Sequence, residues 1–342
     1  MVRVGLAGLG FMGGTHAQCY AALPDAELVA VADAEADRRE KFAQTYGAKP
    51  CASVEQMLSE PIDMVDICLP TYLHRESVEA AAAAKKHILC EKPMALTLAE
   101  CDAMIEAAKK AGVQFMVGHV IRFWPEYMVI KEILDSGRFG KVRWASASRL
   151  SPGPAWSWDN WILDPSRSGG AVLDLHIHDL DFLAWILGKP KAVFAASVKG
   201  KRGGLDSVWT TTIGHPTGAV GFAEGSLEMA ADVPFMMGLK VNLEGGTIEF
   251  NSGQSPSLLV APAGGGVEHP EVPQPEAPSA ASAGTAGNIA ALGGYFIEVQ
   301  YFVNCLEQGK TPDRVTPQDA RLAVELCLAA AKSAETGQPV RL

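Results

Sequence analysis

The feature that most constrains this chain is a glycine pattern close to its N-terminus. Gly8, Gly10 and Gly13 form a G-x-G-x-x-G segment that follows the apolar run 3–9 and opens a helical pattern. The first glycine allows a tight turn, the second lets the backbone approach a pyrophosphate, and the third lets the helix pack closely on the strand. A pyrophosphate would then lie against the free N–H groups at the start of the helix. We therefore predict a dinucleotide-binding loop made of Gly8, Gly10, Phe11, Met12 and Gly13.

An acidic residue stands where such a loop needs one for the adenine ribose. Asp33 ends the next strand-like run, 26–33, and lies 20 residues beyond Gly13. A carboxylate at this position binds the ribose diol and repels a 2′-phosphate, which predicts NAD in preference to NADP. Arg38 and Arg39 follow closely and offer a 2′-phosphate partners, so NADP stays open as the alternative, with Arg38 near the cofactor in either case.

Residues 1–118 alternate between strand-like and helix-like patterns, which is typical of βαβ units. Right-handed crossovers then give an α/β fold, a Rossmann-type doubly wound parallel sheet with helices on both faces. Ligands of such sheets bind at the carboxyl ends of the strands. The predicted strands are 3–9, 26–33, 64–69, 87–90 and 114–118, and the predicted helices are 13–23, 34–46, 54–58, 75–84 and 98–111.

The rhythm changes after residue 118, where consecutive strands without intervening helices indicate a mostly antiparallel sheet. A Pro/Ala/Gly/Ser-rich stretch, 262–287, predicts a surface loop or arm. The predicted strands are 141–150, 192–199, 208–214, 219–227, 238–244 and 247–250, and the predicted helices are 127–136, 170–187, 290–308 and 317–336. We expect a dinucleotide-binding domain over 1–120 and a substrate-binding and oligomerisation domain over 121–342, with the closing helices free to pack back on the first domain.

Composition narrows the class of partner and the compartment. A net charge of −10 argues against binding nucleic acid or anionic lipid through a basic face. Seven cysteines with no C-x-x-C pair predict reduced thiols instead of a disulfide framework or a zinc site. No apolar stretch approaches the roughly 18 residues that a membrane helix needs, and no signal peptide is recognisable. We expect a cytoplasmic protein without bound metal.

A lysine follows the fourth predicted strand. Glu91-Lys92-Pro93 comes directly after the apolar run 87–90, so Lys92 is expected at the carboxyl edge of the sheet, where ligands bind. Beside a positively charged nicotinamide, its pKa would fall and the amine would exchange protons readily. A surface lysine without function is the competing interpretation for this residue taken alone.

Several short motifs occur in a characteristic order along the chain. They are the Gly8–Gly13 loop, Leu69-Pro70-Thr71 with His74, Glu91-Lys92-Pro93, Arg122-Phe123 with Pro125, Gly169-Gly170 leading to Asp174 and His178, and the closing Val315-Thr316-Pro317-Gln318-Asp319. In these, nearly the whole chain resembles the Gfo/Idh/MocA oxidoreductases, which include glucose–fructose oxidoreductase and inositol dehydrogenase. The chain departs from that pattern at Ala171 and His176, where smaller residues are usual, and these departures bear on the substrate.

The resemblance implies an α/β domain with an open-faced sheet after the Rossmann domain, and the open face usually forms a subunit interface. It implies oxidation or reduction of sugars or inositols with NAD(P), catalysed by Lys92, Asp174 and His178. It also implies that Leu69, Pro70, Thr71, His74, Glu91 and Lys92 lie at the cofactor.

Asp174, His178 and Asp181 fall at i, i+4 and i+7 of the predicted helix 170–187 and would share one face. A histidine oriented by carboxylates suits proton transfer near neutral pH. We assign His178 as the base, Lys92 as the group that polarises the substrate oxygen, and Asp174 as the residue that orients both. The roles of Lys92 and His178 are interchangeable at this stage. A solvent-facing ion pair is the simpler alternative, and a metal site is disfavoured because His176 and His178 would point apart.

The substrate contacts are predicted from what surrounds this helix. Asp181 would bind a neighbouring hydroxyl, and Arg122 would lie where the domains join. Trp156, Trp158 and Trp161 occupy the preceding loop, and aromatic faces beside polar groups suit a sugar, with Trp158 the chosen contact. Loop packing or subunit contacts are the equally weighted alternative for these tryptophans.

We therefore predict an NAD-dependent oxidoreductase that transfers a hydride between nicotinamide and a secondary alcohol or ketone of a polyol, inositol or sugar. A homodimer or homotetramer through the open sheet face is expected. Two alternatives remain: a redox-neutral NAD-dependent lyase or glycosidase-type enzyme acting on a sugar, and a non-catalytic NAD-dependent sensor or binding protein. A pure binder has no need of the proton-transfer set Lys92, Asp174 and His178.

Overall fold

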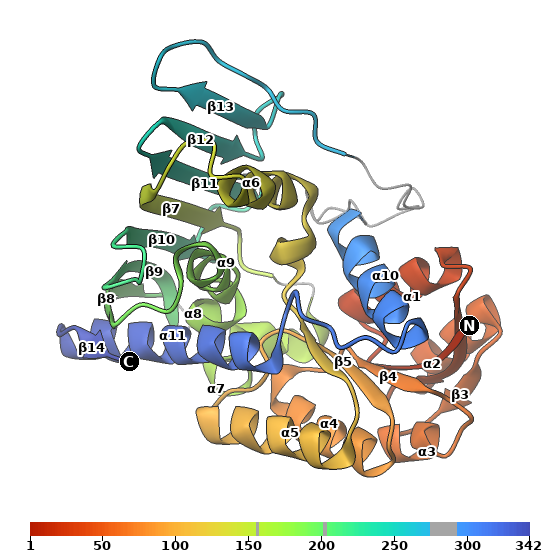
Figure 1. Cartoon of the computed structure of the whole chain (residues 1–342). Coiled ribbons are helices and arrows are strands. Elements are labelled where there is room, and N and C mark those ends of the chain that lie inside the picture. The colour runs from red at the N-terminus through yellow and green to blue at the C-terminus, as the bar shows by residue number, and fades with distance from the viewer. Residues whose placement is uncertain (155–156, 201–203, 274–292) are drawn as a thin grey trace.

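The chain folds around two β-sheets that lie beside one another (Figure 1). The computed structural model describes residues 1–154, 157–200, 204–273 and 293–342. Within these residues, no helix is both long enough and apolar enough to cross a membrane.

The first sheet is parallel throughout, with the strand order β3-β2-β1-β4-β5-β6. This confirms the predicted doubly wound Rossmann-type sheet. The strands are β1 (Val2–Ala7), β2 (Ala26–Ala32), β3 (Lys49–Cys51), β4 (Met64–Ile67), β5 (His87–Glu91) and β6 (Phe115–Gly118), and the helices are α1 (Phe11–Ala22), α2 (Ala36–Tyr46), α3 (Val54–Leu58), η1 (Thr71–Leu73), α4 (His74–Ala83) and α5 (Leu98–Ala111).

Four strands of this sheet end level with one another. Ala7 of β1 pairs with Ile67 of β4, Ile67 pairs with Cys90 of β5, and Cys90 pairs with Val117 of β6. The loops that follow these strands therefore leave the sheet at a single edge. The glycine loop, the segment after β4 and Lys92 all start from that edge.

The second sheet has the order β13-β12-β11-β7-β10-β9-β8-β14 and is antiparallel except for the β10–β7 pair. Helices α8, α9 and α11 pack on one of its faces. The strands are β7 (Val142–Leu150), β8 (Ala192–Lys199), β9 (Leu205–Ile213), β10 (Val220–Ser226), β11 (Met236–Leu243), β12 (Gly246–Asn251), β13 (Leu258–Pro262) and β14 (Val340–Arg341). The remaining helices are η2 (Val120–Phe123), α6 (Pro125–Asp135), η3 (Trp158–Leu163), α7 (Pro165–Ser168), α8 (Gly170–Asp174), α9 (Ile177–Leu187), α10 (Gly293–Glu307) and α11 (Pro317–Thr336).

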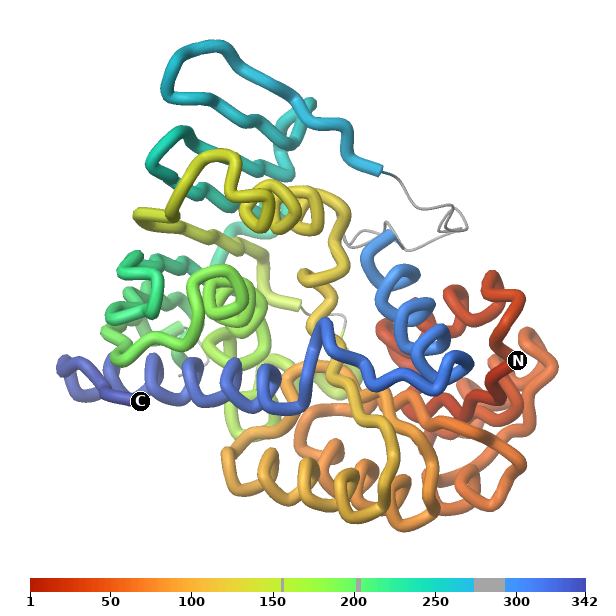
Figure 2. The backbone as a smooth tube through the Cα atoms, viewed as in Figure 1, coloured from red at the N-terminus to blue at the C-terminus, as the bar shows by residue number. Residues whose placement is uncertain are grey.

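The two closing helices tie the halves together. Helix α10 packs against α1 and β1 of the first sheet, whereas α11 contacts α5 and β6 at one end and α9 and β8 at the other (Figure 2). Helix α11 begins with a capping box, in which Thr316 and Asp319 satisfy each other's backbone N–H groups. Its N-terminus is thereby fixed close to the junction of the two sheets.

Three expectations about the elements were incomplete or wrong. The short strands β3, β13 and β14 were missed, since β3 spans only Lys49–Cys51 and contains a proline. The single helix expected over 170–187 is two helices, α8 and α9, separated at Leu175 and His176. The expected arm, 262–287, begins at the end of β13 and turns back so that Glu268 bridges Val260. Its residues from 274 onward lie outside the described residues.

Candidate active site

The glycine loop has the geometry that a pyrophosphate requires. Gly8 has a φ of 85°, and a Cβ there would lie 2.5 Å from the carbonyl oxygen of Cys68. A Cβ on Gly13 would lie 1.9 Å from the Gly8 oxygen, whereas a Cβ on Gly10 would have no atom within 4 Å. Gly10 is the N-cap of α1, and no side chain caps this terminus. The helix start is therefore open to an anion, and its partly exposed first residues, Phe11 and Met12, flank that opening.

Asp33 lies beside the loop and is held by three hydrogen bonds. One carboxylate oxygen accepts from the Leu9 N–H at 2.9 Å and from Arg38 Nη1 at 3.0 Å, and the other accepts from the Glu35 N–H at 2.8 Å. Arg39 is turned to backbone oxygens, including that of Asp33 at 3.2 Å. The structure thus brings Asp33 and Arg38 together at the loop, where both were predicted.

Lys92 and Asp174 meet across the two halves of the chain. Lys92 Nζ donates to Asp174 Oδ1 at 3.1 Å and to the Asp174 carbonyl oxygen at 2.8 Å. The side chains are 16% and 13% exposed, respectively. An ammonium held by one carboxylate and one carbonyl oxygen stands at the same edge of the sheet as the glycine loop.

The break between α8 and α9 makes the second of these bonds possible. In a continuous helix the His178 N–H would donate to the Asp174 oxygen. Here the His178 N–H points to the Leu175 oxygen at 3.4 Å, and the Asp174 oxygen is left for Lys92. The break therefore supplies a carbonyl acceptor for the lysine ammonium.

His178 lies near this pair as a neutral imidazole. Burial lowers its pKa well below the usual value, and the positive charge of Lys92 lowers the pKa further. Its Nδ1 atom is buried and has no hydrogen-bond partner within the described part of the chain. A neutral ring has one nitrogen lone pair, which can accept a proton.

Two expectations about this helix were wrong. Asp174, His178 and Asp181 do not share a helical face, because the break places Asp174 on α8 and the other two on α9. Asp181 is also not free for a substrate hydroxyl. Arg122 donates to both of its oxygens, at 2.8 and 2.7 Å, and both residues are buried. Arg122 is equally occupied, since its remaining nitrogen donates to the Arg314 oxygen at 2.9 Å. The pair is internal and structural.

The predicted cofactor contacts after β4 and β5 divide into two groups. Leu69 and Pro70 are partly exposed at the sheet edge, and Thr71 is buried with a hydroxyl that has no hydrogen-bond partner among the residues that the structure describes. His74, in contrast, faces the Leu69 oxygen at 2.8 Å with one ring nitrogen and the Pro93 oxygen at 2.9 Å with the other. With both nitrogens occupied, His74 links the two loops instead of offering a ligand contact, which corrects the prediction for this residue.

Glu91 is likewise turned into the protein. One oxygen accepts the backbone N–H of Lys92 at 3.0 Å, and the other lies 3.2 Å from Nε2 of His16. Glu91 is 6% exposed. It therefore holds the backbone at Lys92 and does not face the site where a cofactor contact was expected.

Trp158 is 41% exposed on the loop that leads to α8. Arg167 stacks between two aromatic rings, 5.9 Å from the centroid of Trp158 and 5.1 Å from that of Tyr72, and it donates to the Tyr72 hydroxyl at 3.1 Å. This cluster joins the loop to η1 of the first sheet. Trp156 lies outside the described residues.

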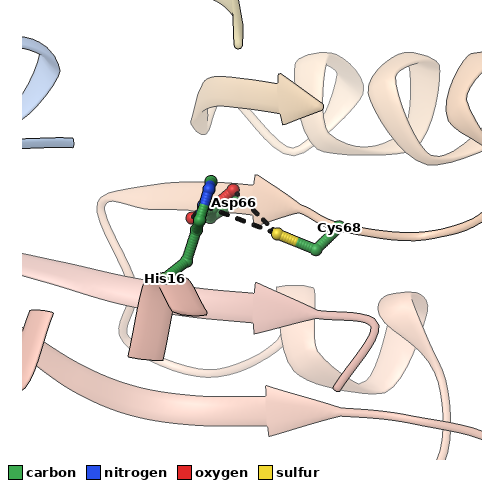
Figure 3. A group of neighbouring side chains, drawn as sticks. All are labelled: His16, Asp66 and Cys68. Atoms are coloured by element: carbon green, nitrogen blue, oxygen red, sulfur yellow. Dashed lines mark hydrogen bonds and ion pairs between the residues drawn. The ribbon is translucent and has the colours of Figure 1, made fainter. Parts of the chain in front are cut away.

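The sequence interpretation missed a buried group of charges below the sheet edge. His16, Asp66 and Cys68 lie together (Figure 3), and Glu298 of α10 approaches from the other side. His16 comes one turn after the glycine loop, which was a usable signal for its place. Asp66 and Glu298 carry no local signal, because only the fold brings them to His16.

Comparisons with known proteins agree with this geometry. Residues 2–119 match the family model described as "Oxidoreductase family, NAD-binding Rossmann fold", and residues 127–249 match that of the "GFO/IDH/MocA C-terminal domain". The chain is 35% identical over 235 residues to myo-inositol 2-dehydrogenase of Thermotoga maritima, which covers 66% of this chain and 68% of that protein. It is 29% identical over 353 aligned positions to scyllo-inositol 2-dehydrogenase (NAD(+)) of Bacillus subtilis, covering 100% and 96%. A levoglucosan dehydrogenase in complex with NADH and levoglucosan superposes with a TM-score of 0.87 at 26% identity over 99% of both chains.

The glycine loop yields a prediction that separates binding from folding. Gly10→Ala should leave the free energy of unfolding unchanged, because a Cβ there meets no atom within 4 Å, but the affinity for NAD should fall about tenfold or more because the methyl group occupies the approach of the pyrophosphate. Gly13→Ala should instead cost about 1–3 kcal/mol of stability through overpacking. Urea unfolding and NAD titration of both variants measure the two effects. Equal losses of stability in the two variants would contradict this placement of the loop.

Proposed function

This chain belongs to the Gfo/Idh/MocA family of NAD-binding oxidoreductases, and from that premise we propose that it oxidises a secondary alcohol of an inositol or sugar with NAD. The observation that carries the proposal is the Lys92–Asp174 contact at the edge of the sheet where the glycine loop also lies. The dehydrogenase names of the inositol and levoglucosan relatives support the substrate class.

The open start of α1 would hold the pyrophosphate, and Asp33 the adenine ribose diol. Leu69, Pro70 and Thr71, which follow β4 at the same edge, would line the path toward Lys92. The bound nicotinamide supplies the hydride acceptor.

His178 would take the hydroxyl proton of the substrate. Its lowered pKa keeps the ring neutral, so one nitrogen lone pair is available for that proton. Lys92 would bind the same oxygen and stabilise the negative charge that develops on it. Asp174 would keep the ammonium directed to that oxygen through its 3.1 Å contact. The O–H and C–H bonds of the same carbinol group then break, the hydride leaves the carbon for the nicotinamide, and the carbon–oxygen bond becomes a carbonyl.

The activity test combines a substrate panel with two variants. Purified protein is mixed with NAD and a series of inositols, aldoses and their anhydro derivatives, and the absorbance of reduced nicotinamide is followed. Lys92→Met and His178→Asn should each lower kcat by about 10²- to 10⁴-fold, with the Kd for NAD nearly unchanged. Lys49→Met is the control, because Lys49 pairs with Glu60 on the surface.

Two results would contradict the proposal. Retention of kcat in Lys92→Met would remove this lysine from the chemistry. Substrate turnover without accumulation of reduced nicotinamide, with NAD bound, would favour a redox-neutral reaction on a sugar.

Preference for NAD over NADP is the second part of the proposal. The Asp33 carboxylate would repel a 2′-phosphate, while its hydrogen bond to Arg38 at 3.0 Å keeps that guanidinium occupied. Asp33→Ser should raise the ratio of kcat/KM for NADP to kcat/KM for NAD by about 100-fold. The variant loses the repulsion between the carboxylate and the 2′-phosphate and frees Arg38 to bind that phosphate, and each of these two changes is worth about 1.4 kcal/mol or more. Adding Arg38→Ala should abolish the gain. A wild-type enzyme that prefers NADP would refute this account of Asp33.

We further propose that the uncovered face of the second sheet binds a second copy of the chain. Phe194 of β8 pairs with Thr211 of β9, and Thr211 pairs with Phe222 of β10, so these side chains form a row on one face. Phe194, Trp209 and Phe222 are 42%, 43% and 41% exposed. An exposed apolar patch of this kind is typical of a protein interface.

The oligomer prediction follows from that row of side chains. Wild-type protein should sediment as a dimer or tetramer, and a Phe194→Arg/Phe222→Arg double variant should sediment as a monomer, because two unpaired charges per copy would be buried in the contact. Val267→Arg is the matched control, since Val267 is 58% exposed in the segment after β13. An unchanged sedimentation coefficient in the double variant would place the contact elsewhere.

A further inference from the structure

A group of buried ionisable side chains lies next to the sheet edge that carries Lys92. Neither the hydride chemistry nor cofactor binding assigns a role to these side chains. His16 comes from α1, Asp66 from β4, Glu91 from β5 and Glu298 from α10. Three of them are 0% exposed and Glu91 is 6% exposed. Burying several charges away from solvent costs free energy of folding unless the charges are paired, so the arrangement needs an explanation.

His16 stands at the centre, with a carboxylate at each ring nitrogen. Nδ1 lies 2.7 Å from Asp66 Oδ2, and Nε2 lies 3.2 Å from Glu91 Oε1 (the Asp66 side is seen in Figure 3). The Asp66 contact is a hydrogen bond, whereas Nε2 and Glu91 Oε1 form a close ion-pair contact and have no hydrogen-bond partner among the described residues. A charge on the ring would attract both carboxylates. Burial by itself would lower the pKa of His16, but the contacts with Asp66 and Cys68 together outweigh burial and hold that pKa well above its usual value.

Glu91 connects this imidazolium to the lysine. One oxygen faces His16 and the other accepts the backbone N–H of Lys92 at 3.0 Å. Burial would raise the pKa of Glu91, but its close contact with His16 and the charges of His16 and Lys92 keep that pKa below its usual value. The carboxylate lies between the His16 ring and the Lys92 backbone N–H, to which it is hydrogen-bonded. Its orientation, and with it the backbone at Lys92, depends on where the His16 ring lies.

Glu298 closes the group as a neutral acid. Its acceptor atoms lie within 4.8 Å of those of His16 and Glu91, and neither of its oxygens has a hydrogen-bond partner among the described residues. Burial and then the charge of Glu91 raise the pKa of Glu298 well above its usual value. The raised pKa favours the neutral acid, which would leave two carboxylates, Asp66 and Glu91, around the His16 ring.

Asp66 is held in turn by a second donor. The Tyr20 hydroxyl donates to the same Asp66 oxygen at 2.9 Å. Both Tyr20 and His16 belong to α1, the helix whose N-terminus forms the phosphate site. Asp66 therefore fixes the position of α1 relative to β4, and His16 extends from that fixed helix to β5.

We propose that His16 is a positioning residue for the dehydrogenase reaction, setting the place of Lys92 relative to the phosphate helix through Glu91. The path has three steps: His16 lies one turn beyond Gly13 on α1, its Nε2 contacts Glu91, and Glu91 holds the Lys92 backbone. Displacements of about 1 Å at a reacting group cost about 10²-fold in rate, so a ring that fixes this backbone acts on kcat. The inference rests on the proposed function.

Two conservative variants separate positioning from simple core stability. His16→Gln places an amide near the former Nε2 and can still donate to Glu91, whereas His16→Asn places an amide near Nδ1 and reaches only Asp66. Both remove the imidazolium and one of its two contacts, so comparable losses of melting temperature are expected. Positioning predicts that kcat falls about tenfold or more in His16→Asn and less than about threefold in His16→Gln. The Kd for NAD should change less than about twofold in either variant.

Glu298→Gln and His215→Gln serve as control variants. Glutamine mimics a protonated carboxyl, so Glu298→Gln should keep kcat near the wild-type value. His215 is also buried, bonded to the Gly188 oxygen and to Thr212 at the far end of α9, and its substitution reports the cost of losing a buried histidine away from the site. If the His16 variants do not fold, Glu91→Gln replaces them, because it keeps an oxygen for the Lys92 N–H while removing the charge that faces His16, and its kcat should fall.

Several outcomes would overturn the inference. Equal kcat in the two His16 variants would mean that the Glu91 contact carries no positioning. A weakened Kd for NAD with kcat retained would assign His16 to the cofactor site alone. A large loss in Glu298→Gln, together with a divalent metal found by elemental analysis of the purified protein, would make the group a cation site. Because wild-type turnover is measured in the same assay, an inactive wild-type enzyme would instead refute the proposed function.

Discussion

The contact between Lys92 and Asp174 is the interaction on which the site depends, because its partners come from different halves of the chain. Lys92 follows β5 of the parallel sheet, and Asp174 ends α8, which packs on the second sheet. A half-buried ion pair of this kind adds little net stability, since desolvation offsets most of its Coulomb energy. Its effect is geometric: it holds one ammonium between a carboxylate and a carbonyl oxygen at the junction of two sheets.

Buried charge pairs fix the elements of the second half that surround this junction. Arg122, Asp181 and the Arg314 carbonyl join η2, α9 and the segment before α11, and Arg149 donates to both oxygens of Asp179 at 3.0 Å. Removing one member of such a pair costs about 3–5 kcal/mol, because the other charge stays buried. Burial and neighbouring charge act in different ways on two histidines. Burial and then the charge of Lys92 lower the pKa of His178, whereas Asp66 and Cys68 together outweigh burial and raise the pKa of His16.

The sequence was most informative where chemistry and local structure coincide. The glycine loop, Asp33 and Lys92 sit at ends of predicted strands, and a parallel sheet brings such ends to one edge whatever the rest of the chain does. The fold class could be predicted for the same reason. The partners of buried charges could not be predicted. Asp181 has the same local sequence pattern whether it faces a substrate or Arg122, which is 59 positions away. His16 and Glu298 meet only through the packing of α10 on α1.

The break after Asp174 explains why helical periodicity gave a wrong prediction for the helix that carries Asp174 and His178. The sequence from Gly170 to Leu187 is compatible with one helix, and its i, i+4 spacing would have placed Asp174 beside His178. In the fold, Lys92 takes the carbonyl oxygen that the His178 N–H would otherwise bind, so a tertiary ion pair replaces a local hydrogen bond. Asp174 thereby pairs with Lys92 across the two halves of the chain. Burial and the charge of Lys92 keep the His178 ring neutral, and a neutral imidazole has one nitrogen lone pair available for a proton.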